Sequence, residues 1–217
     1  MAYPAVFEST SWPDGLIQLL DDHHVAILCD EGRARHHAER AIHEQLSRLP
    51  ESRVIDIDCA AARDLPSFCK QLEPHFADRK PRPEQWWRDV NSVIDLLRGS
   101  DTGTAQGSAF PLAGSEIGVK REYFLWHEAE CLLETDLALF SALVNAFLGV
   151  AAEREHISAE RLLIQRVVFF GGAKLGAYAD DPKGQFSCWL KDDEGSPLWE
   201  VISVVERPMV ITYRVDG

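Results

Sequence analysis

Three short apolar segments constrain the fold of this chain more than any other feature. VAILC (25–29), YFLWH (123–127) and LIQRVVFF (163–170) contain almost continuous runs of large apolar residues. A strand with such a sequence is buried on both faces, as in a parallel sheet covered by helices on both sides. The chain is therefore predicted to form a layered α/β domain with these three strands in its centre.

Two further predicted strands alternate between apolar and polar residues. VIDID (54–58) places its isoleucines on one side and its aspartates on the other, and MVITYRV (209–215) alternates in a similar way. Alternation is typical of strands with one solvated face, so both are predicted to be sheet edges. With the five strands numbered along the chain, the sheet orders 2-1-3-4-5 and 5-1-4-3-2 both satisfy this condition.

Segments with helical periodicity separate the strands. Apolar residues recur at helical spacing in residues 34–49, 84–98 and 136–152, and Asp136 or Thr135 is the candidate N-cap of the last helix. Alternating strands and helices predict a three-layer α/β/α architecture around a mainly parallel five-stranded sheet.

The length of the chain fits one domain. Its 217 residues suffice for a single α/β unit with a full core, so residues 1–217 are predicted to be one domain. Segment 99–118 has five glycines and no periodicity, and is predicted to be a flexible surface loop within it.

Charge and composition exclude several classes of function. The net charge of −13 opposes a large surface for nucleic acid or for an anionic membrane. No stretch approaches the roughly 20 apolar residues that span a bilayer, and the N-terminal segment does not resemble a secretory signal. The five cysteines form no C-x-x-C pair and are interpreted as reduced thiols. We therefore predict a cytoplasmic protein that binds neither nucleic acid nor membranes.

The turn after the first strand stands where a phosphate-binding loop would, but lacks its residues. Such a loop needs G-x-x-x-x-G-K-[ST], in which backbone N–H groups and Lys hold the phosphates and Ser or Thr holds Mg²⁺. In DEGRARHH (30–37) these places hold Asp30, Arg35, His36 and His37. Arginine does not readily take the backbone conformations open to glycine, and histidine offers nitrogen where Mg²⁺ prefers oxygen.

With these features the chain resembles the AAA-type branch of the P-loop ATPases, in a degenerate form, over roughly residues 16–215. In that family the third strand is followed by Asp-Glu, the Walker B element, whereas here YFLW is followed by His127 and Glu128. The fourth strand ends in Gly171 and Gly172, where the family carries a polar sensor residue. The segments that carry the resemblance are VAILCDEGRARHHAERAI, VIDIDCAAARDLPSF, YFLWHEAECLLETD and LLIQRVVFFGG. The family's sheet order is 5-1-4-3-2.

The resemblance implies a fold and argues against activity. Four parts of the catalytic machinery are altered, and losing one such part commonly costs about 10²-fold in rate. Glu128 stands where the family carries the residue that activates water, and it is the catalytic candidate only if the chain is active. We expect no Mg-ATP hydrolysis and no required cofactor. The expected role is that of a protein-interaction or regulatory module, bound to an active ATPase or, as in ring-forming relatives, to itself.

A second interpretation assigns a ligand to the same turn. Gly32, Arg33, Arg35, His36 and His37 lie at a predicted helix N-terminus, where the helix dipole and free N–H groups favour an anion. The chain would then bind ATP, ADP or another phosphate ligand without hydrolysing it. The competing interpretation is that the arginines pair with Asp30, Glu31 or Asp58, since the chain is rich in acidic residues.

A third interpretation is a metal-dependent enzyme. If the loop geometry holds, His37, His127 and Glu128 flank the place of the missing Mg²⁺, and two imidazoles with a carboxylate suit Zn²⁺. No H-x-x-x-H or C-x-x-C spacing supports this site, so the competing interpretation is two histidines in polar contacts at the sheet edge.

The pair Trp86-Trp87 is the candidate partner surface. Adjacent helical residues point about 100° apart, so both indoles cannot occupy one core face. Trp87 lies on the apolar stripe of helix 84–98, which leaves Trp86 to contact a protein partner unless a neighbouring loop covers it.

Overall fold

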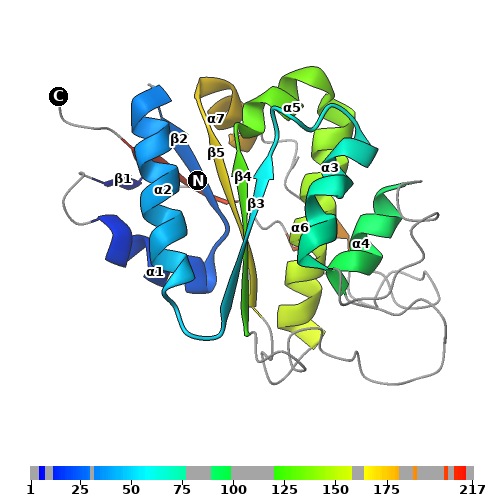
Figure 1. The fold of residues 1–217 in the computed structure, drawn as a ribbon, viewed down its shortest axis with the longest axis horizontal. Helices are drawn as coiled ribbons and strands as arrows, with labels where there is room; N and C mark the ends of the chain where they lie inside the picture. The colour runs from blue at the N-terminus through cyan, green and yellow to red at the C-terminus, as the bar shows by residue number, and fades with distance from the viewer. Residues whose placement is uncertain are drawn as a thin grey trace.

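The computed structural model places a parallel sheet between two layers of helices (Figure 1). It describes residues 5–7, 12–29, 32–76, 89–98, 120–157, 164–180, 188–189, 203–204 and 208–213. The elements, in chain order, are β1 Ala5–Phe7, α1 Trp12–Asp22, β2 Val25–Cys29, α2 Gly32–Ser47, β3 Ser52–Asp58, α3 Leu65–Leu72, the 3₁₀ turn η1 Glu73–His75, α4 Val90–Arg98, β4 Arg121–His127, α5 Ala129–Thr135, α6 Leu137–Ile157, β5 Ile164–Gly171, α7 Ala173–Ala179, β6 Cys188–Trp189, β7 Ser203–Val204 and β8 Met209–Tyr213.

The main sheet has six parallel strands in the order β1-β8-β2-β5-β4-β3. The α/β class and the parallel sheet were therefore predicted correctly, and the order 2-1-3-4-5 is excluded. The order of the described sheet differs from 5-1-4-3-2 by one added strand, because β1 pairs outside β8. A three-residue strand is too short to show a periodicity of its own, and β6 and β7, which form a separate antiparallel pair, are shorter still.

The prediction of two edge strands is half correct. β3 is an edge, and its alternation appears as buried Ile55 and Ile57 beside exposed Asp56 and Asp58. β8 is not an edge, because Ile211–Tyr213 pair with β1 on one side while the strand pairs with β2 on the other.

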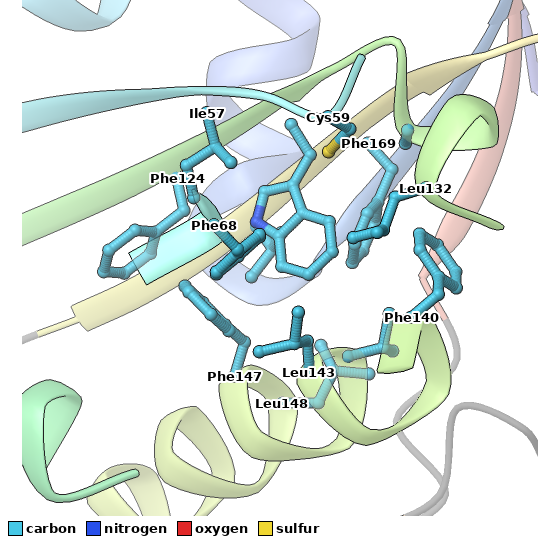
Figure 2. Close-up of a cluster of buried hydrophobic side chains, with 14 of the residues drawn as sticks. Ile57, Cys59, Phe68, Phe124, Leu132, Phe140, Leu143, Phe147, Leu148 and Phe169 are labelled. Carbon is cyan, nitrogen blue, oxygen red and sulfur yellow. The ribbon is translucent and has the colours of Figure 1, made fainter. Parts of the chain in front are cut away.

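The helices form two layers that give the sheet two cores. α1 and α2 cover one face, and α3, α4 and α6 cover the other (Figure 1). On the second face the core is aromatic, and several of its phenylalanines are labelled in Figure 2. Trp126 of β4 is fully buried, and its ring centroid lies 5.1 to 5.8 Å from four phenylalanine rings packed edge-on around it. Those rings belong to Phe68, Phe140, Phe147 and Phe169. Such packing fixes the helical layer in one position.

The predicted helices are present, but their first and last residues differ from the prediction. α2 begins at Gly32 rather than at residue 34, and a short helix, α5, precedes α6 without having been predicted. The described part of the predicted helix 84–98 is α4. Trp86, Trp87 and loop 99–118 lie outside the described residues. No described helix combines the length and the apolar character needed to cross a bilayer.

Asp136 is the residue that caps α6. Its Oδ1 accepts a hydrogen bond from the backbone N–H of Leu139 at 2.9 Å, whereas the Thr135 hydroxyl donates back to the carbonyl of Cys131. We expect Asp136→Ala to lower the free energy of unfolding by about 1 kcal/mol. Thr135→Ala is the matched control and should cost less than about 0.5 kcal/mol. Urea denaturation of both variants measures this, and equal losses would show that Asp136 does not cap the helix.

Candidate functional site at the carboxyl edge of the sheet

The connection between β2 and α2 is too short to form a phosphate cradle. β2 ends at Cys29 and α2 begins at Gly32, so only residues 30 and 31 lie between them. A phosphate-binding loop needs several non-helical residues whose N–H groups converge on the ligand. Arg33, Arg35, His36 and His37 are instead helical, so residues 32–37 of the predicted turn belong to α2.

Arg35 points from α2 into the protein and pairs with two carboxylates. The side chain is 10% exposed; its Nη1 pairs with Oε2 of Glu128, and its Nη2 donates to Oε1 of Glu130 at 2.9 Å. Burial alone would lower the pKa of the guanidinium, but the hydrogen bond to Glu130 and the charges of both glutamates outweigh it and raise that pKa. Arg35 therefore pairs with carboxylates, but its partners among the described residues are Glu128 and Glu130, which the competing interpretation did not name.

Gly172 brings the end of β5 to the same ion pair. Its backbone N–H donates to Oε2 of Glu130 at 2.7 Å, and a Cβ at this position would lie 3.0 Å from that oxygen. Glycine therefore permits this close approach. Through Glu130 and Arg35, the turn between β5 and α7 is joined to α5 and α2.

Glu128 has an unusual backbone that directs its carboxylate to Arg35. Its φ of 50° and ψ of 41° are left-handed, which costs a non-glycine residue roughly 1 kcal/mol. The residue precedes α5 but its side chain does not cap that helix, because the carboxylate pairs with Arg35. The water-activating position of the resemblance is thus occupied by a carboxylate in an internal ion pair.

His127 bridges two carboxylates from different elements. Its Nε2 lies 2.7 Å from Oδ1 of Asp56 on β3, and its Nδ1 lies 3.3 Å from Oε1 of Glu39 on α2. The ring stacks on Phe170 at a centroid distance of 5.5 Å. Both ring nitrogens are engaged, so neither is directed at a substrate or metal.

Two more histidines, both on α2, contact the same two carboxylates. His36 Nδ1 lies 3.3 Å from Oε2 of Glu39, and His43 Nδ1 lies 3.0 Å from Oδ2 of Asp56. We call His36, Glu39, His127, Asp56 and His43 the histidine–carboxylate chain. Burial would raise the pKa values of both carboxyls, but the hydrogen bonds and charges of the histidines outweigh it and lower them.

The histidine–carboxylate chain makes stability depend on pH. Burial would lower the pKa of His127, but its contacts with Asp56 and Glu39 raise it to about 9, above the ordinary histidine value of 6.5. A raised pKa contributes stability that is complete below pH 6.5 and is lost as the pH rises through about 9. Between pH 7 and pH 9.5 we expect the free energy of unfolding to fall by about 2 kcal/mol more in the natural chain than in His127→Gln. Urea denaturation across this range measures the difference, and parallel pH profiles would contradict the assignment.

His37 lies apart from the other predicted metal ligands. Its Nδ1 is 2.6 Å from the hydroxyl of Tyr213 on β8, while His127 contacts Asp56 and Glu39, and Glu128 contacts Arg35. The geometry required for a His37/His127/Glu128 metal site is therefore not present. Within the described part of the chain, no group of three His, Cys, Asp or Glu residues is arranged to hold a metal ion.

Comparison of the chain with protein-family models, with curated proteins and with solved structures finds no match. The roles of residues at this edge therefore follow from geometry alone. Sequence reasoning missed Glu39, Glu130 and His43. The first two carried a signal: Glu39 lies one helical turn after Arg35, and Glu130 lies two residues after Glu128.

Proposed function

We propose that the chain is a degenerate P-loop-like domain of the AAA type that does not hydrolyse nucleotide and acts as a protein-interaction or regulatory module. The observation that carries this proposal is the burial of Arg35 between Glu128 and Glu130. The residue that replaces a loop glycine closes the edge where a nucleotide would bind, and it engages the carboxylate that would activate water.

Electrostatics also supports a site that rejects polyphosphates. The only buried cation that α2 directs to this edge is already paired with two carboxylates, in a chain of net charge −13. A nucleoside triphosphate would have to displace one of these carboxylates and leave it unpaired, which is unfavourable for a partly buried charge. The predicted phosphate site at Gly32, Arg33, Arg35, His36 and His37 is therefore the less favoured alternative.

The contacts of α2 support a static, closed edge. Arg35 joins the helix to Glu128, just after β4, and to Glu130 of α5; His37 joins it to β8, and Glu39 joins it to His127. Such a domain acts by binding a partner through its surface. Its negative charge favours a partner with a basic surface.

Thermal denaturation with added ligands tests this proposal. We expect ATP, ADP, Mg²⁺ and Zn²⁺, each at millimolar concentration, to shift the midpoint by less than about 1 °C, because a ligand that binds only the folded state must raise it. A clear shift with ATP or ADP would favour the phosphate-binding alternative, and a shift with Zn²⁺ alone would favour the metal site.

A further inference from the structure

A row of three polar side chains, two buried and one partly exposed, crosses the sheet near the amino ends of three strands. Arg53 of β3, Glu122 of β4 and Gln165 of β5 are direct neighbours in the strand register. Glu122 has no exposed surface and forms an ion pair with Arg53; Nε2 of Gln165 donates to its other oxygen at 2.7 Å. We call these three residues the polar ladder.

Each end of the polar ladder donates a hydrogen bond to a backbone carbonyl near the end of a helical segment. Nη1 of Arg53 donates to the carbonyl of His75 at 2.8 Å, at the end of η1, and its guanidinium lies 4.9 Å from the ring centroid of Phe76. Nε2 of Gln165 also donates to the carbonyl of Leu97 at 3.3 Å, in the last turn of α4. Carbonyls in the last turn of a helix lack helical partners, so side chains that bind them fix where the helix ends.

Stability alone does not account for the polar ladder. Replacing a buried ion pair by apolar residues of similar volume is often neutral or stabilising, because desolvation offsets the attraction between the charges. What an apolar replacement cannot do is hold two backbone carbonyls in fixed positions. α4 has nine residues, fewer than an isolated helix needs in water, so its order depends on contacts with the rest of the protein.

We propose that the polar ladder is a conformational tether that positions α4 and the end of η1 on the sheet. α4 also packs its apolar side, formed by Val93, Leu96 and Leu97, in the core that it shares with α6. The tether fixes the orientation of α4 within that packing. When the ladder is lost, α4 separates from the sheet as a unit while the strands stay folded.

Hydrogen exchange of a triple variant tests the tether. Arg53→Met/Glu122→Leu/Gln165→Leu removes all three polar side chains of the ladder together, so neither member of its ion pair is left behind. We expect its α4 amides to exchange about 100-fold faster than in the natural chain, with β5 and α6 amides changed by less than about threefold. Gln71→Leu is the matched control. Its amide bonds the backbone of Asp58 at the other end of β3, so its removal should leave α4 unchanged.

Two outcomes would overturn the tether. If the folded triple variant protects α4 as well as the natural chain does, the apolar contacts alone position that helix. If exchange accelerates equally in α4, α6 and β5, the ladder supports the whole fold rather than α4. Should the triple variant not fold, Gln165→Leu alone removes the bond to Leu97 without creating a charge, and unchanged α4 exchange in that variant overturns the proposal equally.

Discussion

Replacement of Arg35 by alanine is expected to lower the free energy of unfolding by about 3 kcal/mol, because it removes the cation that Glu128 and Glu130 share. The two carboxylates would remain partly buried without a counter-charge. Glu128 would also keep a left-handed backbone that its ion pair no longer supports. Urea denaturation at pH 7 measures the loss.

The neighbouring arginine supplies the control for this measurement. Arg33 lies on the same first turns of α2 but is exposed, so Arg33→Ala should change the free energy of unfolding by less than about 0.5 kcal/mol. If both variants lose the same stability, Arg35 acts as an ordinary surface residue and the edge is not closed by its ion pairs. If Arg35→Ala gains stability from added ATP, the edge retains a phosphate site that Arg35 had blocked.

Glu122→Leu is expected to have an effect at least as large, about 4 kcal/mol, because Glu122 is fully buried and its partner Arg53 is mostly buried. The variant would leave Arg53 with an unpaired charge at the amino end of the sheet and would remove the acceptor of Gln165. The loss should be largely restored when Arg53→Met and Gln165→Leu are added, because the triple variant also removes the charge of Arg53.

A surface glutamate provides the comparison for Glu122. Glu51 pairs with Lys120 at 2.8 Å, but both side chains are about half exposed or more, so Glu51→Ala should cost less than about 1 kcal/mol. A similar loss for Glu51→Ala and Glu122→Leu would mean that burial does not determine the strength of the ion pair at Glu122.

The main sheet could be predicted because its strands differ in sequence. Continuously apolar segments became β2, β4 and β5 in the interior, and the alternating segment 54–58 became the edge strand β3. β8 alternates as well, yet it is covered by β1. The reason is that alternation shows which face of a strand is solvated. It does not show whether a short strand such as β1 pairs along the strand's edge.

The candidate site was predicted less well because its contacts are distant in sequence. Arg35 and Glu128 are 93 residues apart, and His37 and Tyr213 are 176 apart. Matching the first turn to a phosphate-loop pattern drew attention to Arg35, His36 and His37 but did not indicate their partners in the protein. In the pattern residues 35–37 face a ligand, whereas in a helix that begins at Gly32 they point toward three different partners.

A double-mutant cycle between Arg35 and Glu128 tests the central claim most directly. The free energies of unfolding of the natural chain, Arg35→Ala, Glu128→Ala and the double variant give the coupling between the two side chains, and the backbone strain at residue 128 cancels from it. If the ion pair closes the carboxyl edge, the coupling should be at least about 1.5 kcal/mol. A coupling below about 0.3 kcal/mol would mean that the two side chains act independently and that the edge is open.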